Sequence, residues 1–119
     1  MTPVADVRTA FTTWERSGET SARGTVRLPA SLPVFAGHFP GAPLVPGVYV
    51  LATLAEVAAR AGIGTQVVAV ERAKWSAPAY PDQDLVATVA WKPVDGGWQL
   101  DGEVANPAGV CATCRLIVR

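Results

Sequence analysis

The stretch from Val48 to Ala61 constrains the fold of this chain more than any other. It consists of good helix formers, and Gly62 stands just past its end, where a left-handed cap residue belongs. The predicted helix is apolar almost all the way round, with polar residues only at Thr53, Glu56 and Arg60. A helix of this kind must be wrapped by other structure.

Runs of β-branched or alternating residues predict strands on both sides of this helix. Turn signals rich in Gly, Asn and Asp separate several of them. The predicted strands are Thr9 to Arg16, Thr20 to Leu28, Val67 to Lys74, Leu85 to Lys92, Trp98 to Val104 and Val110 to Val118. Trp75, Trp91 and Trp98 stand at strand positions and are predicted to be core or interface side chains. The pattern predicts an α+β fold, one domain over residues 1–119, with an antiparallel sheet curled around a single central helix.

Composition excludes several classes of function. Lys plus Arg equals Asp plus Glu at ten each, so the chain lacks the basic footprint of a nucleic-acid-binding protein. The apolar stretch from Ala42 to Ala59 is interrupted by prolines and a glutamate, which argues against a membrane span, and the N-terminus does not resemble a signal peptide. We therefore expect a cytoplasmic protein in which Cys111 and Cys114 are reduced, buried thiols rather than metal ligands.

The segment 30–46 is rich in proline and glycine and is predicted to be irregular. It contains His38, the only histidine of the chain, between Phe35 and Phe39. A rigid backbone and apolar neighbours hold an imidazole in one pose. They also keep it neutral at about pH 7, as a general base requires. Gly47 then begins the helix, where free N–H groups can hold a carbonyl oxygen that gains negative charge. Base and oxyanion donor together suit removal of a proton α to a carbonyl.

The sequence GHFPGAPLVPGV, which ends at Val48, resembles the signature of the FabA/FabZ family of 3-hydroxyacyl-ACP dehydratases. The stretch from Ala73 to Leu85 is similar to that family's ARFKRPVxPGDQL stretch, and only the first ten or so residues lack a counterpart. The resemblance implies a hotdog fold and a dimer whose central helices pack side by side. It also implies an apolar tunnel that admits the acyl chain on the phosphopantetheine arm of acyl carrier protein, with no metal and no organic cofactor of the enzyme itself.

By this resemblance, His38 removes the α-proton of the thioester, and the amides of Gly47 and Val48 hold the thioester oxygen. Phe39, beside the base, is a further predicted substrate-binding residue. Tyr49 is predicted either to gate the acyl tunnel or to pack against the rest of the protein.

The chain departs from the family at the catalytic acid. The family places an Asp or Glu 14 residues after the histidine, and this chain has Ala52 there. Glu56 follows one turn later, about 40° around the helix, and side chains lean toward the helix N-terminus. Glu56 is therefore the candidate catalytic acid, unless it only pairs with Arg60.

Three functions are consistent with these residues. The first is a dehydratase that makes a trans-2-enoyl thioester in fatty-acid or polyketide-type biosynthesis. The second is a catalytically incomplete subunit, which forms a heterodimer with a related hotdog chain that supplies the acid. The third is a hotdog thioesterase, against which the loop around His38 argues.

Overall fold

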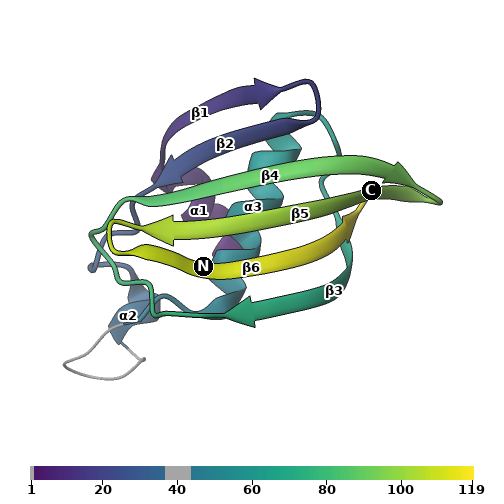
Figure 1. The fold of residues 1–119 in the computed structure, drawn as a ribbon. Helices are drawn as coiled ribbons and strands as arrows, with labels where there is room; N and C mark the ends of the chain where they lie inside the picture. The colour runs from purple at the N-terminus through teal and green to yellow at the C-terminus, as the bar shows by residue number, and fades with distance from the viewer. Residues whose placement is uncertain (1, 37–43) are drawn as a thin grey trace.

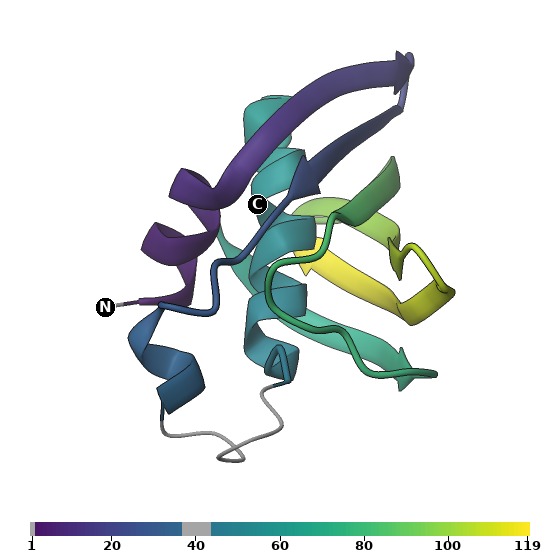
Figure 2. The same ribbon diagram turned by 90° about the vertical axis from the view of Figure 1, so that its left-hand side faces the viewer.

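The computed structural model describes residues 2–36 and 44–119. Six strands form one antiparallel sheet in the order β1-β2-β4-β5-β6-β3 (Figure 1), and the sheet curls around helix α3 (Figure 2). The elements are α1 (Pro3–Ala10), β1 (Phe11–Gly18), β2 (Ser21–Val26), α2 (Pro33–Ala36), α3 (Gly47–Arg60), β3 (Val67–Trp75), β4 (Leu85–Val94), β5 (Gly97–Asn106) and β6 (Gly109–Val118). The arrangement is the predicted α+β hotdog fold.

Helix α3 agrees with its prediction to within one residue at each end. Leu54 and Val57 of α3 are fully buried, and Leu54 faces the sheet at Gly102 of β5. Gly62 adopts a φ of 81°, as a left-handed cap, and its amide donates to Ala59 O at 3.0 Å. Among the described residues, no helix has the length and hydropathy to cross a membrane.

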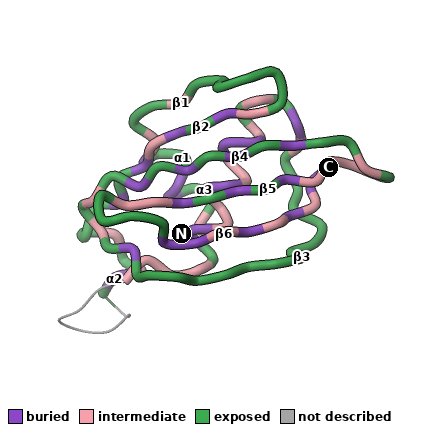
Figure 3. The backbone as a smooth tube through the Cα atoms, viewed as in Figure 1, coloured by how far each residue is buried: buried purple, intermediate pink, exposed green. Residues whose placement is uncertain are grey.

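The sheet packs against α3 through alternate residues of its strands. In β4 the side chains of Leu85, Ala87, Val89 and Trp91 are buried, while the residues between them are exposed. Figure 3 shows buried and exposed stretches along the strands of the sheet. On β5, a Cβ at Gly102 would lie 2.8 Å from the Cδ2 atom of Leu54. Glycine at this position therefore lets the helix approach the sheet closely.

Strand β3 forms one end of the sheet and pairs with β6 alone among the described residues. Every residue of β3 is exposed, including Val67, Val68 and Val70. Apolar residues along an open strand edge form a surface to which another chain can add by main-chain hydrogen bonds.

Two short helices correct the sequence analysis. Thr9 and Ala10, predicted to begin a strand, belong to α1, which begins with Pro3 and is capped by the Thr2 side chain. The segment 30–46 was predicted to be irregular, but residues 33–36 form α2, because Pro33 fits the first turn of a helix. The sheet therefore curls around one central helix, as predicted, while α1 packs against that helix (Figure 2).

Replacement of Leu54 by Ala should lower the free energy of unfolding by about 3 kcal/mol, because it leaves a cavity between α3 and the sheet. Urea denaturation measures the change. Val86→Ala, at an exposed position of β4, is the control and should change stability by less than about 1 kcal/mol. Equal effects of the two substitutions would contradict this account of the core.

Candidate active site

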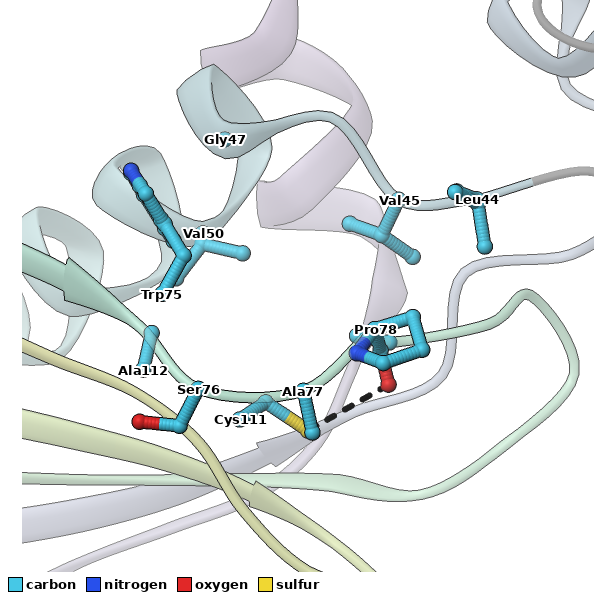
Figure 4. Close-up of a pocket in the computed structure, with 11 residues that line it drawn as sticks. Leu44, Val45, Gly47, Val50, Trp75, Ser76, Ala77, Pro78, Cys111 and Ala112 are labelled. Carbon is cyan, nitrogen blue, oxygen red and sulfur yellow. Dashed lines mark hydrogen bonds between the residues drawn. The ribbon is translucent and has the colours of Figure 1, made fainter.

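An apolar cavity of about 490 Å³ lies between the first turn of α3 and the end of β3 (Figure 4). Among the described residues, no charged side chain lines it. The walls come from the segment before α3 (Leu44, Val45), from α3 (Gly47, Val50), from the end of β3 and the segment after it (Trp75, Ser76, Ala77, Pro78, Ala79) and from β6 (Cys111, Ala112). A cavity of this size and polarity suits an apolar ligand.

Main-chain hydrogen bonds hold the walls of this cavity together. The amide of Val45 donates to Ala79 O at 2.8 Å, and the amide of Ser76 donates to Cys111 O at 2.8 Å. The segment that leads into α3 is therefore fixed to the segment that follows β3. These bonds preform the cavity between two parts of the chain that are far apart in sequence.

Trp75 lies directly over the start of α3. A Cβ at Gly47 would be only 3.1 Å from two atoms of its ring, so the glycine allows this contact. Trp91 is a core side chain, as predicted, whereas Trp75 is 52% exposed and lines the cavity. The strand pattern predicts Trp75 as a core or interface residue. The signal for its place at the cavity is its position in the stretch that is similar to the dehydratases.

The predicted base, His38, and the predicted binding residue Phe39 lie outside the described residues. Their roles stay predictions. Leu44 and Val45, which follow this segment directly, line the cavity. In the sequence, these two wall residues stand between the predicted base and α3.

The first turn of α3 has Pro46 as its N-cap, and no side chain caps it in the described part of the chain. The amides of Tyr49 and Val50 both donate to Pro46 O, at 3.0 and 3.3 Å. Helix geometry leaves the amides of Gly47 and Val48 without acceptors inside the helix. Gly47 lines the cavity, and Val48 is 59% exposed.

Tyr49 points away from this cavity and toward α1. Its hydroxyl donates to Asp6 Oδ2 at 2.5 Å, and the two residues are 4% and 2% exposed. Burial, together with the hydrogen bond to Asp6, raises the pKa of Tyr49 to about 12. Tyr49 also lines a smaller cavity with residues of α1 and α2. Its partner Asp6 carries no sequence signal that predicts this contact.

The Glu56 carboxylate lies between two arginines. It is 3.1 Å from Arg8 of α1 and 3.0 Å from Arg60, which confirms the pairing with Arg60 that sequence analysis considered. The Glu56 side chain is 11% exposed and begins about 13.5 Å along the helix axis from Gly47, outside the cavity lining. Its role as catalytic acid stays a prediction.

Cys111 and Cys114 are both buried and free, as predicted. The Sγ atom of Cys111 lies 3.7 Å from Pro78 O at the edge of the cavity (Figure 4). Burial raises the pKa of Cys114, which favours its neutral thiol. Within residues 2–36 and 44–119, no group of three or more His, Cys, Asp or Glu side chains is placed to hold a metal ion.

Comparison with known proteins gives a consistent picture. Residues 14–112 match the family model of ApeI-like proteins, described as ApeI dehydratase. The chain is 32% identical over 111 residues to the 3-hydroxyacyl-[acyl-carrier-protein] dehydratase FabZ of Roseobacter denitrificans, covering 82% of this chain and 72% of that protein.

Two solved structures share the fold. The first is the dehydratase heterocomplex ApeI:P from Xenorhabdus doucetiae, with a TM-score of 0.75 and 21% identity over 90% of this chain and 94% of that chain. The second is a hypothetical thioesterase from Streptococcus pneumoniae with coenzyme A, with a TM-score of 0.64 and 15% identity over 98% of this chain and 94% of that chain.

The ionisation of Tyr49 should destabilise the protein at alkaline pH. Its pKa is raised from 10.0 to about 12 in the folded state, so its contribution to stability is complete below pH 10.0 and is lost as pH rises toward about 12. The phenolate absorbance of a Tyr80→Phe variant, in which Tyr49 is the remaining tyrosine, measures the shift.

Urea denaturation across the same pH range measures the stability. Tyr49→Phe is the control and should lack this part of the alkaline loss. A Tyr49 absorbance midpoint near pH 10.0 in the folded protein would contradict the buried hydrogen bond.

Proposed function

Because the chain belongs to the family of ApeI-like dehydratases, we propose that it removes water from a 3-hydroxyacyl thioester carried by acyl carrier protein, giving the trans-2-enoyl thioester. The reaction would serve fatty-acid or polyketide-type biosynthesis. The observation that carries the proposal is the apolar cavity, which is lined by Gly47 of α3 and by Leu44 and Val45. Leu44 and Val45 stand six and seven residues after His38 in the sequence. The two free, buried thiols agree with a reducing compartment such as the cytoplasm.

In the proposed reaction His38 takes the α-proton of the thioester. The electron pair of the broken C–H bond forms the new double bond as the C–O bond breaks. The β-hydroxyl takes a proton from the His38 imidazolium, or from a carboxyl group supplied by Glu56 or by a second chain, and leaves as water. The thioester oxygen gains negative charge during the first step, and the amides of Gly47 and Val48 stabilise it by hydrogen bonds and the helix dipole. The acyl tail occupies the apolar cavity beneath Trp75. Phe39 would contact the substrate beside the base.

His38→Ala should lower kcat/KM for a 3-hydroxyacyl-ACP by at least about a hundredfold, because it removes the base. Absorbance of the enoyl thioester measures the rate. An unchanged melting temperature of the variant shows that the loss is chemical. A variant that keeps the wild-type rate would exclude His38 as the base.

Two surfaces support assembly of the active form from two hotdog chains. The first is a stripe on α3 at i, i+4, i+7 and i+11 spacing, which we call the α3 seam: Val48, Ala52, Ala55 and Ala59. These residues are exposed or half-buried although all are apolar, as in a helix that packs against a second helix. The second is the open edge of β3, which offers main-chain hydrogen bonds to a second chain.

A catalytically incomplete subunit is the second candidate function. Ala52, which replaces the family's acid, lies on the α3 seam, where a second chain would approach. Glu56 is held by Arg8 and Arg60 rather than by groups at the cavity. A related hotdog chain could place its own carboxylate near Ala52. This arrangement predicts little activity of the chain alone and full activity on mixing. A thioesterase remains the third candidate, because a hypothetical thioesterase has the same fold.

Ala52→Glu should raise the dehydration rate of the chain alone by at least about tenfold, because it restores a carboxylate at the family's position. Ala55→Glu, one turn along the same seam, is the matched control and should give no gain. Size-exclusion chromatography checks that both variants assemble alike. Equal rates of the two variants would contradict a missing acid at position 52.

Glu56→Gln completes this comparison. We expect this variant to keep the rate within a few-fold, since the carboxylate that it removes is paired with two arginines in the wild type. A loss of about a hundredfold or more would instead identify Glu56 as the relocated acid.

A further inference from the structure

Helix α1 lies alongside α3 and precedes the residues that match the dehydratase family, which begin at residue 14 (Figure 2). It touches α3 at two polar points. At the surface, Arg8 pairs with Glu56, and the Arg60 side chain donates to Arg8 O at 3.2 Å. In the interior, Asp6 accepts the hydrogen bond from Tyr49. The second contact lies on the first turn of α3.

The buried contact between Asp6 and Tyr49 carries a desolvation cost. A carboxyl group removed from water loses its hydration, and an apolar pair of the same shape would avoid that cost. Asp6 Oδ2 has Tyr49 as its partner, whereas Oδ1 is buried without one among the described residues. Apolar side chains alone could pack α1 against α3. The stability of the helix contact therefore does not explain why this buried pair is polar.

Tyr49 belongs to the first turn of α3, whose amides are the predicted oxyanion donors. Its amide donates to Pro46 O at 3.0 Å, and its carbonyl accepts from the Thr53 hydroxyl at 2.8 Å. On another side of the same turn, the Trp75 ring contacts Gly47. The first turn of α3 is therefore held between α1 and the end of β3. Release of the Tyr49 side chain would remove one of these two supports.

We propose that Asp6 and Tyr49 are positioning residues: their buried hydrogen bond fixes the first turn of α3 so that the amides of Gly47 and Val48 meet the thioester oxygen. The proposal rests on the proposed dehydratase function. It assigns to α1 a role in the active site although no residue of α1 lines the large cavity. The amides act on charge that develops in the reaction, so a displaced turn should lower kcat more than it changes KM.

The test uses the double variant Asp6→Leu/Tyr49→Phe. It removes both polar groups and keeps side chains of similar shape, so the two helices should still pack. We expect kcat to fall about 10- to 100-fold with KM within a few-fold, on the scale of misplaced catalytic groups. The single variant Asp6→Asn keeps a side-chain oxygen that accepts the hydrogen bond from the Tyr49 hydroxyl. It should therefore keep most of the wild-type rate.

Trp14→Phe is the matched control. It removes the hydrogen bond from the indole N–H to Val57 O, which lies near the other end of α3. This variant should lose stability without loss of kcat. If it lowers kcat as much as the double variant does, general loosening of α3 explains the effect and the proposal is wrong.

Hydrogen exchange provides a second readout that does not depend on activity. The amide of Val50, bonded to Pro46 O, reports on the first turn, and amides near Arg60 report on the other end. The double variant should speed exchange at Val50 at least about tenfold and leave the distal amides unchanged, because local opening of one turn exposes its own bonds. Unchanged exchange at Val50 overturns the proposal.

The two readouts separate the possible failures. A wild-type chain with no dehydratase activity, alone or with a partner chain, removes the proposed function and the catalytic role of Asp6 together. An active wild type whose double variant keeps kcat overturns the positioning role alone. An active wild type whose double variant loses kcat, with faster exchange confined to the first turn, supports both.

Discussion

The approach of an apolar helix to the inside of a curled sheet is the contact on which the rest of this structure depends. Gly102 removes the side chain that would otherwise meet Leu54, so α3 lies close to the strands. Burial of this face fixes the axis of the helix, and the axis determines where the first turn lies. The cavity then forms between that turn and the segments that follow β3, which main-chain bonds hold to the chain before α3.

Local patterns in the sequence predicted most of the fold and missed what depends on distant partners. The bounds of α3 and its Gly62 cap followed from residues adjacent in sequence. Helix α1 was missed because Thr9 and Ala10 continue into a strand without a break, although Thr2 and Pro3 supplied a start signal. The pairing of Asp6 with Tyr49 joins residues 43 apart, and neither residue type indicates such a partner by itself.

The sequence located one residue of the cavity wall and missed others. Gly47 was identified from its place at a helix start, and the structure places it at the cavity. Trp75 was not identified as a cavity residue, because an aromatic residue in a strand pattern is usually buried. Its exposure depends on the position of β3 at the edge of the sheet. The position of Glu56 also depended on Arg8, a residue of the helix that sequence analysis missed.

The first turn of α3 is where these features meet. An oxyanion donor works only if it is in place before charge develops, because reorganisation during the reaction would cost part of the stabilisation. A helix end is the part of a helix most prone to fray, since its first amides have no partners inside the helix. This end is held by Trp75 on one side and by the Asp6–Tyr49 pair on the other. A buried polar contact is directional in a way that apolar packing is not, which gives a physical reason for an unfavourable carboxyl group to be kept at this turn.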